Sequence, residues 1–298
     1  MGGVVDYIQF VFMPQVFNGL TIGVAVILMA LGLTIIFGLL DVINMAHGEF
    51  YALGAYLGIT LASHGVGFWL LLIAVPLILL PLGYGSDRLL IQRVFHQKDR
   101  HMLTLLLTFG LAIIMEDVFK LVYGPNTIKP ETPISGGTEL FGNFFPSYRL
   151  FLMVFGTATI AAVWLAVHRT RFGSMVRAAA FDKNMASSLG VPVGKVYSAT
   201  FAFGVALAGL SGVLLAPIYS VFPTMGKDFI LMAFTVVIVG GLGNIKGVVF
   251  AGLLLTQVQA ISSLYISPVW ADPLVFAIMV LVLMVRPQGI LGGKLGHA

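Results

Sequence analysis

A serine in the second half of the chain has the spacing of a nucleophile motif. The run Gly209-Leu210-Ser211-Gly212 matches the GxSG pattern of intramembrane serine proteases, which need a histidine base on a later span. After Ser211 the sequence holds one histidine, His297. Because that dyad is missing, we expect Ser211 to be a small residue at a helix interface. The protease is therefore the disfavoured alternative, and we name no catalytic residue.

A glycine-rich stretch, GGLGNIKG from Gly240 to Gly247, superficially resembles a nucleotide-binding loop. It lies in a hydrophobic chain without a βαβ pattern, and no Gly-Lys pair of the sequence is followed by Ser or Thr. We therefore expect no ATP site in this chain. We interpret Gly240, Gly241, Gly243 and Gly247 as structural glycines at a broken or sharply turning helix.

Residue types that bind metals or form disulfides are sparse. The chain has no cysteine, which excludes disulfides, thiolate catalysis and Cys-based metal sites. There is no HExxH motif, and most histidines fall at the ends of apolar runs or in loops, where solvated imidazoles are the default. We expect neither a metal nor a cofactor in this chain.

Three polar residues in the first part of the chain could line a path through a membrane. Asn44, His47 and Glu49 lie in DVINMAHGEF, between two apolar segments. A charged group at the centre of a bilayer costs about 3 kcal/mol, so Glu49 must face a partner, a water-filled cavity or the interface. Two hypotheses stay open. The break lines a translocation path, or it is a short interfacial turn whose polar side chains are solvated.

Composition shows what kind of elements position these residues. The chain of 298 residues is 59% hydrophobic and 9% charged, with a mean hydropathy of +1.02, and this is too little charge for a water-facing surface. The charges sit in short loops, so the net charge of +4 reports orientation in a bilayer. It gives no reason to expect nucleic-acid binding. No cleavable signal peptide is evident, because no basic residue precedes the first apolar run.

Apolar runs separated by basic or Gly/Pro-rich loops predict an all-α, polytopic integral membrane protein with a single transmembrane domain over residues 1–298. The runs are 17–40, 53–61, 68–84, 102–122, 150–168, 196–218, 229–239, 248–266 and 273–285. We expect residues 1–13 to lie along the interface, a kink at Pro76 and Pro81, and residues 124–148 on the outer face.

The distribution of basic loops predicts the topology. If every run crosses, there are nine transmembrane helices and the N-terminus is outside. If the segment around residues 41–61 is re-entrant, there are eight crossings and the N-terminus is inside. Both alternatives place the C-terminus in the cytoplasm.

The one long polar interval in the second half runs from Arg169 to Lys195. It holds five Lys and Arg against one acid, so we expect it in the cytoplasm. Asp182 is a good N-cap, the seven residues 183–189 suit one short helix, and Gly190 can close it in the left-handed conformation.

A helix this short is unstable alone in water and needs support from its own protein on one side. Met185, Ala186 and Leu189 offer a small apolar face that could enter a partner's groove on the other side. The alternative is an ordinary basic loop between two spans.

Four motifs together resemble the permease subunits of ABC importers for branched-chain amino acids. They are NMAHGEFYALGAY from Asn44, RAAAFDKNMASSLGVPVGKV from Arg177, GGLGNIKGVVFAGLLL from Gly240 and RPQGILG from Arg286. They occur in the family's order, and the resemblance runs from about residue 18 to residue 292. The permease type with the AHGE motif is the closer match. Permeases of urea and short-chain amide importers are similar too, so such a substrate is an alternative.

The resemblance implies a transport subunit of the bacterial inner membrane that is not itself an enzyme. Its implied partners are a second permease, two ATPase subunits that bind ATP and Mg, and a periplasmic binding protein that delivers branched-chain or other neutral amino acids. The interval 169–195 corresponds to the family's loop that contacts the ATPases. The ATPase-coupling residues implied here are Arg177, Asp182, Lys183, Met185, Ala186, Leu189 and Gly190.

Overall fold

The computed structural model describes residues 6–95, 97–140 and 142–292. Its helices, in chain order, are the π-helix η1 (Ile8–Phe12), α2 (Met13–Leu40), α3 (His47–Ser63), α4 (Phe68–Ser86), the π-helix η2 (Asp87–Ile91), α5 (Gln92–Val94), α6 (Arg100–Tyr123), α7 (Ser147–Arg169), α8 (Arg171–Phe181), α9 (Lys183–Ser188), α10 (Val193–Tyr219), α11 (Met225–Gly240), α12 (Ile245–Ser262) and α13 (Pro268–Val285). A two-stranded antiparallel hairpin, β1 (Gly137–Leu140) and β2 (Asn143–Pro146), precedes α7. The all-α, polytopic class predicted from the sequence is confirmed.

The helices α2 and α10 form the interior of the molecule. Every residue of α2 from Gly23 to Ile36 is buried, and so is every residue of α10 from Gly204 to Pro217. Glycines let the two backbones touch, because a Cβ added at Gly204 would lie 2.8 Å from the carbonyl oxygen of Gly32. A helix that is apolar on all sides belongs inside a bundle, and these two are surrounded by the others.

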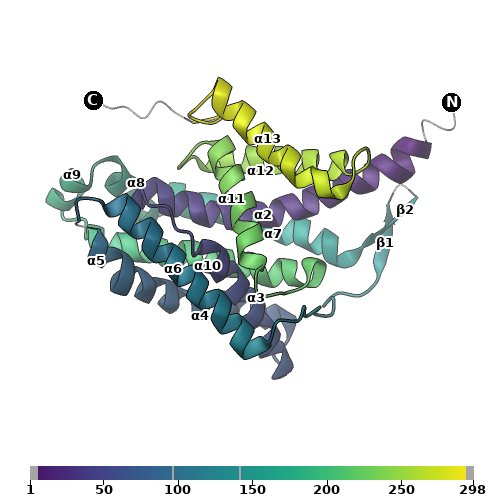
Figure 1. Cartoon of the computed structure of the whole chain (residues 1–298), viewed down its shortest axis with the longest axis horizontal. Coiled ribbons are helices and arrows are strands. Elements are labelled where there is room, and N and C mark those ends of the chain that lie inside the picture. The colour runs from purple at the N-terminus through teal and green to yellow at the C-terminus, as the bar shows by residue number, and fades with distance from the viewer. Residues whose placement is uncertain (1–5, 96, 141, 293–298) are drawn as a thin grey trace.

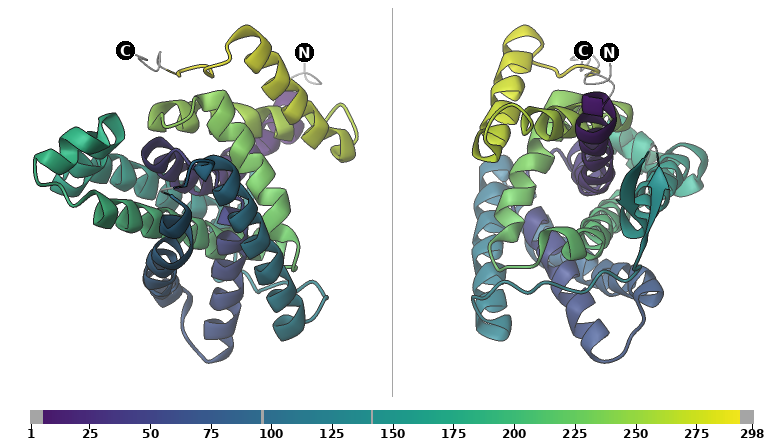
Figure 2. Two further views of the ribbon diagram at one scale, coloured as in Figure 1. Left: turned by 60° about the vertical axis from the view of Figure 1, so that its left-hand side comes forward. Right: turned by 90° about the vertical axis from the view of Figure 1, so that its right-hand side faces the viewer.

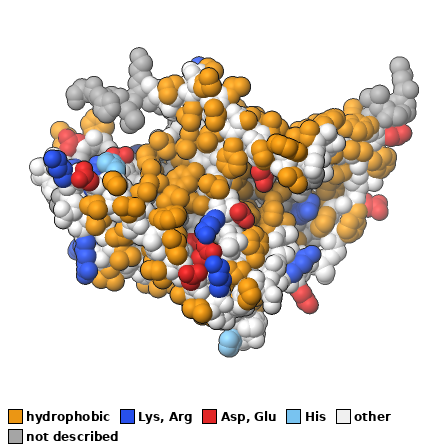
Figure 3. Space-filling view, viewed as in Figure 1, with side chains coloured by type: hydrophobic (Ala, Val, Ile, Leu, Met, Phe, Trp, Pro, Cys, Tyr) orange, Lys and Arg blue, Asp and Glu red, His pale blue; other side chains and the backbone are white. Residues whose placement is uncertain are grey.

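The outer helices expose their apolar side chains. In α4, α6 and α13, side chains such as Trp69, Leu121 and Met284 have no protein neighbour covering most of their surface. Figure 3 shows hydrophobic side chains over most of the face that it presents. Among the described helices, six are long and apolar enough to cross a membrane, and the shorter helix 269–285 is also apolar. Lipid is the environment that suits such a surface.

The two ends of the bundle are distinct in Figure 1, where α8 and α9 lie at the left and the β-hairpin lies at the right. At the α9 end, Asp41 at the end of α2 pairs with Arg100 of α6 (Nη2 to Oδ2, 3.4 Å). At the hairpin end, the side-chain nitrogen of Asn143 donates to the carbonyl oxygen of Gln9 at 2.6 Å. The helices α2 and α10 run between these ends in opposite directions (Figure 1), whereas α6 lies at an angle to them (Figure 2).

Three segments have more regular structure than the apolar runs alone predict. The described part of residues 1–13 continues directly into α2 as one helix over 8–40, with Pro14 in the first turn of α2, where proline is tolerated. The basic segment after residue 86 begins as helix and extends the α4 rod to Val94. The outer loop 124–148 contains the β-hairpin, in which Gly142 has φ +75° and so suits a tight turn.

Candidate functional site

A break between α2 and α3 holds the first group of predicted site residues. Asp41 ends α2 in the left-handed conformation, with φ +52°, which aspartate tolerates better than most residues. Residues 41–44 form no regular structure, and the Asn44 side-chain oxygen accepts a hydrogen bond from the Ala46 amide at 3.1 Å. The chain then re-enters the bundle and begins α3 at His47.

The polar residues of this break are fully buried. Asn44 and His47 are 0% exposed, and Glu49 is 1% exposed. The His47 Nε2 atom lies 3.1 Å from the carbonyl oxygen of Met29, in the middle of α2, so α3 starts deep inside the protein. These side chains are not solvated, which contradicts the hypothesis of a water-exposed interfacial turn.

A second break, between α10 and α11, also follows a long helix that ends in a left-handed residue. Ser220 ends α10 in the left-handed conformation with φ +66°, and α11 begins at Met225 after a short irregular segment. Among the described residues, Asp41 and Ser220 are the two non-glycine residues with positive φ. α2 runs from the hairpin end to the α9 end, whereas α10 runs the opposite way, so the two broken units are inverted relative to one another (Figure 1).

The starts of α3 and α11 meet. A Cβ added at Gly48 would overlap the carbonyl oxygen of Gly226, and a Cβ at Gly226 would lie 2.5–2.8 Å from the Glu49 carboxylate. The carboxylate therefore sits against the first turn of α11, where the helix dipole favours a negative charge. Sequence reasoning missed Gly226, because nothing in the local pattern shows which glycine faces Glu49.

A charge cluster beside this contact joins α6 to α11. The Glu116 carboxylate pairs with Lys120 at 2.7 Å and with the Nζ atom of Lys227. Its side chain is 6% exposed, whereas both lysines are about half exposed. Lys227 follows Gly226 directly, so this ion pair holds the start of α11 in place.

The polar interval 169–195 folds into α8 and α9. Asp182 caps α9, since its Oδ1 atom accepts hydrogen bonds from the amides of Asn184 at 2.8 Å and Met185 at 2.9 Å. Gly190 follows the helix with φ +86°, and the Val191 amide returns to the Ala186 carbonyl oxygen at 3.0 Å. The helix ends at Ser188, one residue earlier than predicted.

The exposed face of α9 differs from the prediction in one residue. Ala186 is 2% exposed and faces its own protein, whereas Met185 and Leu189 are 59% and 78% exposed. Phe181, at the end of α8, is 89% exposed and was missed. The face available to a partner is thus Phe181, Met185 and Leu189, which we call the α9 apolar face. Helical spacing could not have found it, because Asp182 is extended and separates Phe181 from α9.

Two basic residues of the interval bind within the chain. Arg177 donates through Nη1 to the carbonyl oxygen of Val167 and so ties α8 to α7. The Lys183 Nζ atom lies 6.0 Å from the centre of the Phe95 ring, which connects α9 to the segment after α5. The first contact holds α8, which precedes α9, and the second holds α9 itself.

The glycine stretch forms the turn between α11 and α12. Gly240 and Gly247 pack backbone to backbone, and Gly241 and Gly243 have φ values of +102° and +79°. The Gly243 amide donates to the Thr34 side-chain oxygen of α2 at 3.2 Å. Side chains at these positions would separate the two helices.

Ser211 also has a packing role, because its hydroxyl donates to the Ala25 carbonyl oxygen at 2.8 Å in the buried α2–α10 interface.

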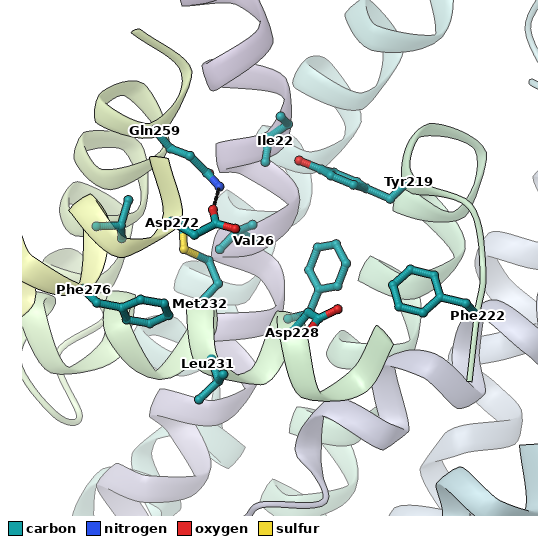
Figure 4. Close-up of a pocket in the computed structure, with 12 residues that line it drawn as sticks. Ile22, Val26, Tyr219, Phe222, Asp228, Leu231, Met232, Gln259, Asp272 and Phe276 are labelled. Atoms are coloured by element: carbon teal, nitrogen blue, oxygen red, sulfur yellow. Dashed lines mark hydrogen bonds between the residues drawn. The ribbon is translucent and has the colours of Figure 1, made fainter. Parts of the chain in front are cut away.

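A cavity of about 320 Å³ opens next to the second break (Figure 4). Its lining comes from α2, the end of α10, the α10–α11 break, α11, α12 and α13. The lining residues are Ile22, Val26, Tyr219, Phe222, Asp228, Phe229, Leu231, Met232, Gln259, Asp272, Val275 and Phe276. It combines an apolar and aromatic wall with two carboxylates, and sequence reasoning did not identify it.

The fold and these sites define a multi-pass membrane permease, with broken helices that meet inside it. The family described as "Branched-chain amino acid transport system / permease component" matches residues 15–283, and the chain belongs to this family.

Named relatives align over nearly the whole chain. The high-affinity branched-chain amino acid transport system permease protein LivH is 33% identical to this chain, both in Salmonella typhimurium and in Escherichia coli, over 94% of this chain and 96% of the relative. BraD of Pseudomonas aeruginosa, described as a permease protein of the same kind of system, is 30% identical over the same shares. The permease LivM of Escherichia coli is 27% identical and covers 91% of this chain. No solved structure matches.

Proposed function

We propose that this chain is the permease subunit of an ATP-driven importer that carries branched-chain amino acids across the inner membrane. The observation that supports this most is the identity of 33% with proteins named LivH over 94% of the chain. We propose as partners a second permease, a pair of ATPase subunits that bind ATP and Mg, and a periplasmic binding protein. The more distant likeness to LivM is in keeping with two related permeases side by side.

In the proposed topology, the α9 end faces the cytoplasm and the hairpin end faces the periplasm. This topology has nine crossings, in which α3 and α11 are each completed by the break that precedes them. The N-terminus is then periplasmic and the C-terminus cytoplasmic. The excess of Lys and Arg in the interval 169–195 supports this orientation.

The α9 apolar face is the proposed contact with an ATPase subunit. Three exposed apolar side chains, at the end of α8, in α9 and directly after α9, suit insertion into a groove. When ATP draws the ATPases together, α9 and the adjoining α8 move with them. Arg177 of α8 carries the movement to α7, and Lys183 of α9 carries it to the segment after α5.

The meeting point of α3 and α11 is the proposed gate region of the path. Asn44, His47 and Glu49 start one broken helix, and Gly226 starts the other. Broken helices give a membrane protein backbone and side-chain polar groups at depth, and in inverted repeats they mark the translocation site. A shift of either helix start changes the contact between Gly48 and Gly226.

Reconstitution tests the function directly. The chain is placed in liposomes with its second permease, the ATPases and the binding protein, and uptake of labelled leucine is measured with ATP. We expect uptake only from the complete set, competition by isoleucine and valine, and none by urea. Uphill leucine uptake by this polypeptide alone, or competition by urea instead of valine, would contradict the proposal.

A further inference from the structure

We infer that the cavity beside the α10–α11 break is a binding station for the transported amino acid, in which Asp228 and Asp272 hold its ammonium group. This inference rests on the proposed function and adds to it the residues that touch the substrate. The cavity has a volume of about 320 Å³, which is the size of a site for one small molecule.

Within the described part of the chain, neither Asp228 nor Asp272 forms an ion pair. Lys227 is adjacent to Asp228 in sequence, but it pairs with Glu116. Both residues are exposed in this chain, so a ligand in the cavity can reach them, and an ammonium group is the partner that suits a carboxylate.

Hydrogen bonding orients one of the acids. The Gln259 side-chain nitrogen of α12 donates a hydrogen bond to Oδ1 of Asp272 in α13. This bond orients the carboxylate, and the Oδ2 atom is not part of it. Figure 4 shows both carboxylates and the Tyr219 hydroxyl directed toward the space between the helices. The hydroxyl is a donor, so it suits the carboxylate group of a bound amino acid.

The rest of the wall is apolar. Val26, Met232 and Phe276 line the side of the cavity near Asp272, and Phe222 lines the side near Tyr219 (Figure 4). The Phe229 ring also lies on that side, with its centre 5.3 Å from the centre of the Tyr219 ring. A branched aliphatic side chain buries its surface there, at about 0.8 kcal/mol per buried CH₂. Urea has neither a positive charge nor an aliphatic part, so it would leave the acids without a cation and the wall without a partner.

The position of the cavity links it to the proposed gate. Phe222 lies in the break itself, and Asp228 and Phe229 lie in the first turn of α11, directly after the contact with Gly48 and Glu49. A movement of the start of α11 therefore moves one carboxylate relative to the other, which stays with α13. Binding strength at this station would change with the state of the gate.

Protection of an introduced cysteine tests occupancy. Because the chain has no native cysteine, Met232→Cys places the single thiol of this chain in the cavity wall, and Thr132→Cys provides a control on the exposed outer loop outside the cavity. In the assembled importer, we expect 10 mM leucine to slow modification of the Met232→Cys thiol by a small maleimide at least about fivefold, a protection corresponding to about 1 kcal/mol. Urea at the same concentration should not slow it, and neither compound should affect Thr132→Cys. The inference is overturned if leucine does not change the modification of Met232→Cys, or if Met232→Cys does not react in the assembled importer while Thr132→Cys does.

Charge removal separates the inference from the proposed function. We expect Asp228→Asn and Asp272→Asn each to lower the rate of leucine uptake at least about tenfold, since each loses a charge-assisted bond to the ammonium group. Glu131→Gln, in the outer loop and away from the cavity, serves as the control with normal uptake. Normal uptake in both aspartate variants overturns the binding station and leaves the proposed function standing. Absence of leucine uptake in the wild-type importer overturns the proposed function itself.

Discussion

The helices α3 and α9 begin in opposite surroundings. α9 starts on the surface, where the Asp182 carboxylate caps two amides within three residues of itself. α3 starts in the interior, where His47 contacts α2 and Gly48 contacts α11, both far away in sequence. The surface helix is thus specified by its own residues, whereas the interior helix is specified by its neighbours. Changes at the two starts should therefore differ in size and in what they disturb.

The largest effect is expected at the interior start. Gly48→Ala adds a methyl group that overlaps the carbonyl oxygen of Gly226, so α3 and α11 must separate. Overpacking of this kind costs about 1–3 kcal/mol, and we expect a lower thermal unfolding midpoint of the purified protein in detergent. The matched control is Gly110→Ala in α6, where nothing lies within 4 Å of the added methyl and helix propensity improves stability by about 0.8 kcal/mol. Equal stability of the two variants would show that the helix starts do not touch.

An intermediate effect is expected beside that contact. Lys227→Met leaves the buried Glu116 carboxylate with Lys120 alone, and the loss of one charged hydrogen bond costs about 2 kcal/mol, reduced by the exposure of Lys227. The measurement is a double-mutant cycle of unfolding midpoints with Glu116→Gln. If the two residues act together, the double variant is more stable than the sum of the single changes allows. Strict additivity would mean that the ion pair does not hold α11 to α6.

The same contrast explains how much the sequence predicted. The apolar runs, the cap at Asp182 and the left-handed Gly190 are local signals, and the structure has helices, a cap and a turn where these signals lie. The burial of Asn44, His47 and Glu49 depends on α2 and α11, so spacing alone left two hypotheses open.

Residues brought together by the fold were harder to predict still. The meeting of Gly48 with Gly226 and the gathering of Asp228 and Asp272 at one cavity involve helices distant in sequence. The inverted relation of the two breaks also leaves no motif, because it consists of one left-handed residue after each long buried helix. Ala186 was assigned to the wrong side of α9 because a six-residue helix gives too few positions to define a face.

The smallest effect on stability, and one of a different kind, is expected at the surface start. Asp182→Ala removes the side-chain acceptor of two amides, which destabilises α9 by about 1 kcal/mol without changing the interior. The unfolding midpoint should stay within about 1 °C of the wild type, because α9 is a local unit at the surface. If α9 binds in an ATPase groove, it must be folded when it binds. The free energy of about 1 kcal/mol lost from the folded α9 then weakens binding, and the dissociation constant for the ATPase subunits should rise about fivefold. Asp182→Ser keeps a capping oxygen and should restore most of the affinity, whereas equal affinity in all three proteins would mean that the cap has no part in docking.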